Sequence, residues 1–143
     1  MSVAVSTLGR MGDVAAPEQR DLVRAAAEEI LGREVRQSWH RDYRQMARGT
    51  LAALDWVEGR RETAPSTGEY RGPDDRVVLG RRGYETSALH VEINRSEDWG
   101  SGHVRPPNED MHFHGAVWSL LRWWRSPTDR LLTLAITVPG LDV

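Results

Sequence analysis

Two histidines stand one residue apart in the segment NEDMHFHGAVWSLLRWWRSP (108–127), directly after two acidic residues. On a β-strand, residues i and i+2 face the same side, so His112 and His114 could bind one metal ion together. On a helix the same two side chains lie about 200° apart and cannot share an ion. The secondary structure of this segment therefore decides whether its histidines indicate metal chemistry.

The residues around the two histidines favour a helix. Two prolines precede Asn108, a good N-cap residue, and two acids fill the first turn, where negative charge is stabilising. A Ser-Pro pair at 126–127 would end the helix. The apolar positions between these ends keep helical spacing: Phe113, Ala116, Val117, Leu120, Leu121 and Trp124. The sequence therefore predicts that His112 and His114 do not bind one metal ion together.

A second group of residues that could do chemistry lies in 84–94, YETSALHVEIN, where alternating apolar residues predict a strand. His90 and Glu92 would share one face of that strand, and with His112 they would form a two-histidine, one-carboxylate set. Such a set suits one divalent metal ion, or acid/base catalysis, in a small lyase, isomerase or hydrolase. We favour the simpler interpretation, a half-exposed strand with a polar side and no cofactor.

Arginines along the predicted helix 34–58 give a third candidate site. Arg36, Arg44 and Arg48 lie off the apolar stripe of that helix. Arginine makes bidentate contacts with phosphate and carboxylate, so an anion site or a nucleic-acid-binding helix is a second alternative. The formal net charge of −2 provides no basic field for nucleic acid, and a solvated helix flank is the favoured interpretation.

The composition excludes several chemistries. The chain has no cysteine, and all 19 residues counted as Lys+Arg are arginine. Thiolate nucleophiles, disulfides, cysteine zinc sites, Schiff bases and Walker-A lysines are therefore absent. The sequence also lacks the GxSxG, GxGxxG and HExxH motifs. The missing lysine is typical of codon bias in a GC-rich genome, for which we expect an actinobacterial or actinophage origin.

The elements that would position these residues follow from apolar periodicity. We expect an α+β fold in which a small antiparallel or mixed sheet has helices against one face. Gly49, in the middle of the second helix, would let another backbone approach closely. The predicted order is α-α-β-β-α-β: helices from Pro17 to Gly32 and over 34–58, strands at 76–80 and 84–94, a helix over 109–125 and a strand at 130–138.

The domain organisation predicted from sequence is simple. Residues 1–15 form a flexible N-terminal arm, and residues 16–143 form a single domain. Within it, the loop 59–75 separates a helical half from a mixed half. The 28% charged composition and the lack of a long apolar run predict a cytoplasmic protein without a membrane segment.

The helix over 109–125 carries a second face that is typical of protein interfaces, because tryptophan, methionine and arginine are enriched at interface cores. We therefore predict a non-catalytic binding module that acts as a homo-oligomer or as an accessory subunit of a larger protein assembly. The N-terminal arm is a further candidate contact surface. The predicted interface residues are Met111, His114, Trp118, Arg122, Trp123 and Arg125.

Overall fold

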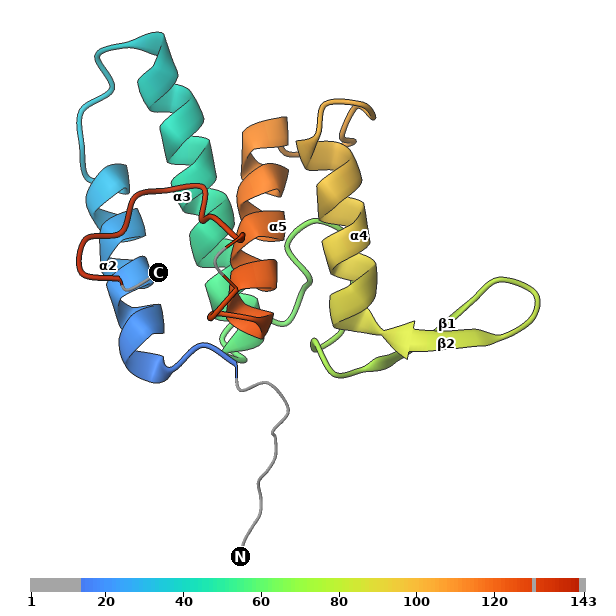
Figure 1. Cartoon of the computed structure of the whole chain (residues 1–143). Coiled ribbons are helices and arrows are strands. Elements are labelled where there is room, and N and C mark those ends of the chain that lie inside the picture. The colour runs from blue at the N-terminus through green and yellow to red at the C-terminus, as the bar shows by residue number, and fades with distance from the viewer. Residues whose placement is uncertain (1–13, 130, 142–143) are drawn as a thin grey trace, which may run out of the picture.

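The computed structural model describes residues 14–129 and 131–141. Its helices stand side by side in one row, in the spatial order α2, α3, α5, α4 (Figure 1). A β-hairpin projects sideways from the start of α4. The elements are α2 (Pro17–Leu31), α3 (Ser38–Val57), β1 (Arg76–Leu79), β2 (Tyr84–Ser87), α4 (Ala88–Gly100) and α5 (Met111–Arg125).

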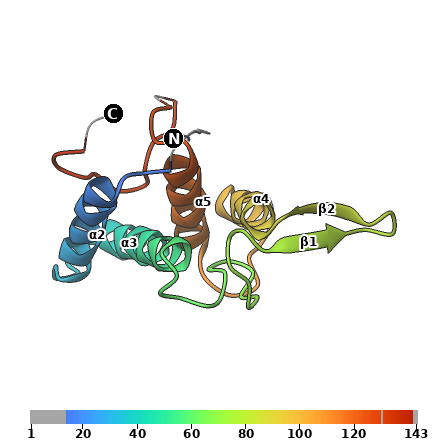
Figure 2. The ribbon, with the colours of Figure 1, turned by 90° about the horizontal axis from the view of Figure 1, so that it is seen from below.

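Two segments outside the helices, one loop and the C-terminal segment, cover opposite faces of the row of helices. Figure 2 shows the loop 58–75 on one face, and the C-terminal segment 131–141 on the other. The loop is anchored by the Trp56 indole, whose Nε1 donates to the carbonyl oxygen of Arg71 at 2.6 Å. The C-terminal segment is anchored by Ile136, which is buried between α2 and α3, and by the N–H of Thr137, which donates to the Tyr43 hydroxyl at 3.0 Å.

The helices of the N-terminal half form where the sequence predicts them. Pro17 opens α2, since its missing N–H and fixed φ suit the first turn, and Gly32 caps the other end. The second helix begins at Ser38 rather than near residue 34, because the N–H of Gln37 donates to Nδ1 of His40 at 3.1 Å. This bond gives a partner to one N–H that the start of the helix leaves free.

The predicted strand 84–94 is confirmed only over 84–87, and the predicted terminal strand is wrong. Strand β2 ends at Ser87, whose hydroxyl accepts a hydrogen bond from the N–H of His90 at 3.1 Å and so caps the helix α4. The predicted terminal strand has no counterpart among the described residues 131–141, which lie along the helices without a ladder partner. Helices together with a two-stranded antiparallel sheet still make an α+β fold, in the order α-α-β-β-α-α.

Glycine allows the helices to pack closely. A Cβ placed on Gly49 of α3 would lie 2.2 Å from the carbonyl oxygen of Phe113 in α5. A Cβ on Gly100 of α4 would lie 2.6 Å from the Cα of Gly115 in α5. The expected close approach at Gly49 is confirmed, and α5 is held between two neighbours by backbone-to-backbone contact.

The N-terminal arm is described only at its end. Residues 1–13 of the predicted arm 1–15 lie outside the described residues. Ala15, which the sequence assigns to the arm, is fully buried, and its N–H donates to the carbonyl oxygen of Trp124 at 2.8 Å. No helix within residues 14–129 and 131–141 has both the length and the apolar character needed to cross a membrane.

Candidate functional site

The two histidines of α5 point to different environments, as the helix predicts. His114 is 0% exposed, and its Nδ1 lies 2.7 Å from the Ser66 hydroxyl of the covering loop. The ring packs against Trp99 of α4 at 5.0 Å between centroids, and its Nε2 is buried without a hydrogen-bond partner among the described residues. Burial lowers the pKa of His114, although the nearby acids Glu109 and Asp110 partly oppose the shift. The ring is therefore neutral at pH 7.

A buried carboxylate completes this polar cluster. Glu92 of α4 is 1% exposed and accepts hydrogen bonds from the N–H groups of Ser66 and Thr67, the latter at 3.2 Å. Burial raises the pKa of Glu92, and the two N–H donors work against that rise because they stabilise the carboxylate. We call Glu92, Ser66, Thr67 and His114 the loop clamp, since they fix the loop 58–75 to α4 and α5.

The loop clamp does not have the arrangement of a hydrolytic triad. The Ser66 hydroxyl contacts His114, but the Glu92 carboxylate binds backbone N–H groups rather than the imidazole. Ser66, Glu92 and His114 are each at most 1% exposed, so no substrate reaches the hydroxyl in this conformation. The geometry supports a structural role for the loop clamp, which is to hold the loop 58–75 against α4 and α5.

The predicted set of His90, Glu92 and His112 is not brought together. His90 and Glu92 lie on a helix rather than a strand, so they point to different sides, and His90 Nε2 lies 3.1 Å from Asn94 Nδ2. His112 lies 3.6 Å from the Asp42 carboxylate of α3. Within the described part of the chain, no group of three or more His, Asp or Glu side chains is placed to hold one metal ion.

The three arginines proposed for anion binding are each engaged locally. Arg36 pairs with Glu34 at 2.8 Å, and Arg48 pairs with Glu109 at 3.0 Å. Arg44 donates to the carbonyl oxygen of Leu31 at the end of α2. These groups point to separate partners and do not form one positive surface.

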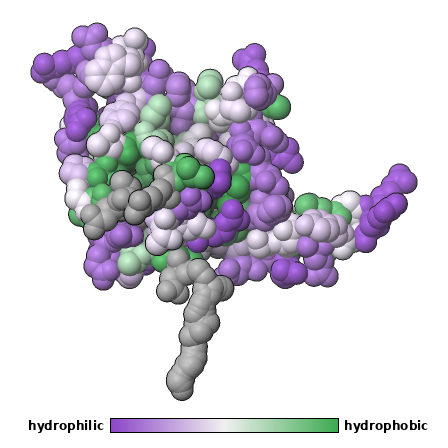
Figure 3. Space-filling view, in the orientation of Figure 1, coloured by the Kyte–Doolittle hydropathy of each residue, from purple (hydrophilic) through white to green (hydrophobic). Residues whose placement is uncertain are grey.

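An apolar groove of about 380 Å³ lies between α3, α4 and α5. Its floor is low because Gly100, Gly115 and Ala116 are small, and its walls are formed by Met46, Met111 and Trp118. Ala135 of the C-terminal segment closes one end. In Figure 3 hydrophobic residues gather beside that segment, while the outer flanks are hydrophilic. The remaining lining residues are Ser96, Glu97, Ser101, His112 and Ser119.

The groove contains two of the predicted interface residues, Met111 and Trp118. Arg122 follows them along α5, with its guanidinium 4.9 Å from the centroid of the Trp118 ring. With Trp118 it lines a smaller hollow of about 150 Å³ that reaches Leu131, a side chain 90% exposed. Arg125 is exposed at the end of the helix.

The placement of His114 and Trp123 on an exposed face is wrong. Both are buried, at 0% and 3% exposure. His114 is covered by Trp99 of α4, in a stretch that the sequence assigns to a loop. Trp123 packs in the main core beside the C-terminal segment. The exposed stripe of α5 is therefore narrower than the sequence predicts.

Sequence reasoning missed the residues that give the groove its shape. Met46 and Gly115 both line the groove, and neither is among the interface residues predicted from the sequence. A usable signal was present, because glycines inside two neighbouring helices mark a close crossing. No family model, curated protein or solved structure matches this chain significantly.

Proposed function

We propose that this protein is a non-catalytic binding module, acting as a homo-oligomer or as an accessory subunit of a larger protein assembly. The groove between α3, α4 and α5 is the surface through which it holds an apolar segment of a protein partner. The observation that carries the proposal is the groove itself, a concave apolar surface walled by Met46, Met111 and Trp118.

The side chains in the walls are suited to this task. Methionine is unbranched and polarisable, so Met46 and Met111 can adapt to different apolar side chains. Trp118 offers a large, rigid apolar surface, and tryptophan is enriched among residues that dominate binding energy. Arg122, stacked on that ring, supplies a charged group at the rim, where partner selection is commonly determined.

The test is a double substitution, Trp118→Ala with Arg122→Ala, compared with the single control Trp39→Ala. Trp39 is 59% exposed on α3 and does not line the groove. Its substitution therefore removes the same type of side chain as Trp118→Ala, but at a position outside the groove. Native mass spectrometry and sedimentation velocity would measure the oligomeric state. Affinity capture with the full chain would measure partner binding.

We expect the double variant to lose self-association or partner capture while the control keeps both. Thermal unfolding of each variant would establish that the helices remain folded. If oligomeric state and capture are both unchanged in a folded double variant, the groove is not the binding surface and the proposal fails.

A further inference from the structure

The β-hairpin is the least supported part of the described chain. Among the described residues, strands β1 and β2 pair only with each other, and they meet the body of the protein at the end next to α4, where Val77 of β1 is buried. A single two-stranded hairpin is marginally stable in water without further packing. Figure 2 shows it extending well beyond the helical row. Its surface is therefore available to a partner.

One face of the hairpin is apolar. The register pairs Val77 with Thr86 and Leu79 with Tyr84, and cross-strand partners share a face. Val77 is buried near α4, but Leu79 and Tyr84 are 39% and 61% exposed. An apolar strip thus leads outward from the body of the protein along the hairpin.

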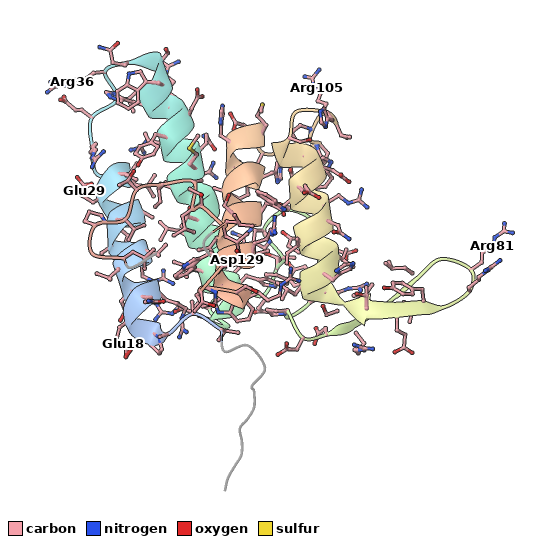
Figure 4. The ribbon with its side chains drawn as sticks, in the orientation of Figure 1. Glu18, Glu29, Arg36, Arg81, Arg105 and Asp129 are labelled. Carbon is pink, nitrogen blue, oxygen red and sulfur yellow. The ribbon has the colours of Figure 1, made fainter. Side chains whose placement is uncertain are left out.

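The tip beyond this strip is strongly positive. Arg81 and Arg82 occupy the turn between Gly80 and Gly83, which both have positive φ. Both arginines are exposed, and neither has an ion-pair partner among residues 14–129 and 131–141. Figure 4 shows Arg81 at the far end of the hairpin, pointing away from the helices.

The groove between α3, α4 and α5 is complementary to the apolar strip and positive tip of the hairpin. Its walls are apolar, and its titratable lining residues are Glu97 and His112, with no arginine among the described residues that line it. His112 also contacts the Asp42 carboxylate at 3.6 Å, which adds negative charge beside the groove. An apolar strip ending in two arginines therefore matches the α4 side of the groove, where Glu97 lies, rather than the α5 end that carries Arg122.

The hairpin of one molecule is placed to meet the groove of another, not its own. It leaves α4 at the first residue, whereas the groove is lined by the last turns of that helix. Thirteen residues of helix separate these ends by about 20 Å. The hairpin also extends sideways from the start of α4, away from the row of helices (Figure 1).

We infer that the occupant of the groove is the hairpin of a second copy of this chain, with Leu79 and Tyr84 against Met111 and Trp118 and the tip arginines near Glu97. Reciprocal exchange of the two hairpins produces a closed dimer with one twofold axis. This inference rests on the proposed function, because it names what the groove binds.

A charge swap tests the pairing. The hairpin variant carries Arg81→Glu and Arg82→Glu, and the groove variant carries Glu97→Arg. A control with Arg33→Glu and Arg36→Glu makes the same change in charge on exposed residues between α2 and α3, far from both surfaces. Each full-length protein is measured alone, and the first two are also measured as an equimolar mixture, by sedimentation velocity and native mass spectrometry.

We expect the wild type and the control to dimerise, with an affinity that falls as salt rises. Each swapped variant alone should show at least about tenfold weaker dimerisation, a change of about 1.4 kcal/mol. The mixture should recover a heterodimer, because both of its hairpin–groove pairs then join opposite charges. Recovery in the mixture excludes a simple folding defect.

Three outcomes overturn this inference: a monomeric wild type, a hairpin variant that dimerises like the control, or a mixture that does not recover. The proposed function fails separately. If the Trp118 and Arg122 substitutions abolish another partner's capture while the wild type is monomeric, the groove binds, but not a second copy. If they abolish dimerisation while the hairpin variant does not, a different surface of the second copy occupies the groove.

Discussion

The loop 58–75 closes one face of α5 with buried polar contacts, whereas the C-terminal segment leaves much of the opposite face open. On the closed face, His114 and Glu92 are held by Ser66 and Thr67, away from solvent. On the open face, His112 lies at the edge of an apolar groove. The two histidines of one motif thus differ because different segments cover them. Residue type alone did not determine which of them is accessible.

The largest effect expected from this difference concerns two tryptophans of α5. Trp123→Ala should lower the free energy of unfolding by about 3–5 kcal/mol, because it removes a buried side chain from the main core. Trp118→Ala should cost about 1–2 kcal/mol, since that side chain is only partly buried at the groove. Urea unfolding of both variants measures the two values. Equal losses would mean that the open face is packed as tightly as the core.

The loop clamp predicts the next effect. Glu92→Leu should destabilise the protein by about 3 kcal/mol, because it leaves the buried N–H groups of Ser66 and Thr67 without an acceptor. Glu92→Gln is the matched control, since its single amide oxygen still accepts from one of the two N–H groups, and it should cost about 1 kcal/mol. Hydrogen exchange at the two amides reports directly on the loop. A Leu variant that keeps both amides protected would show that other contacts hold the loop.

The helices could be predicted from the sequence because their signals are local. Pro17, Gly32 and the apolar spacing of 109–125 each act within a few residues, and the structure has helices there. Helix α4 was missed because Leu89, Val91 and Ile93 alternate as in a strand, although Ser87 followed by good helix formers was a signal for an N-cap. Trp99 of α4 covers His114. Because α4 was not predicted, His114 was wrongly expected on an exposed face.

The prediction of a strand at 130–138 was wrong because strand formation depends on residues far away in the sequence. Leu132, Leu134, Ile136 and Val138 are more buried than the exposed residues Leu131, Thr133 and Thr137, so alternate side chains face the protein. A strand also needs a partner for its backbone groups, and the two-stranded sheet lies beyond α4, on the other side of the molecule (Figure 1). Apolar periodicity reports which residues face inward, but not what they pair with.

The smallest expected effect is a pH dependence of the free energy of unfolding, caused by His114 beneath the loop 58–75. The pKa of His114 is lowered by burial, whereas in the unfolded chain a histidine has a pKa of about 6.5. Below that pH the unfolded chain binds the extra proton and the folded protein resists it. The free energy of unfolding should therefore fall as the pH drops from about 6.5 towards the lowered pKa, by at most about 1.4 kcal/mol for each pH unit.

Glu92 acts in the opposite direction, in a window that begins at about pH 4.3 and extends upward towards that of His114. Its raised pKa means that stability from its protonated form is present below about pH 4.3 and is lost as pH rises through the folded value. Chemical denaturation between pH 7.5 and about 5 therefore isolates His114 best when the background is Glu92→Gln. In that background His114→Gln, which keeps a polar side chain beside Ser66, should remove the decline in stability. A decline that persists would show that His114 is not its source.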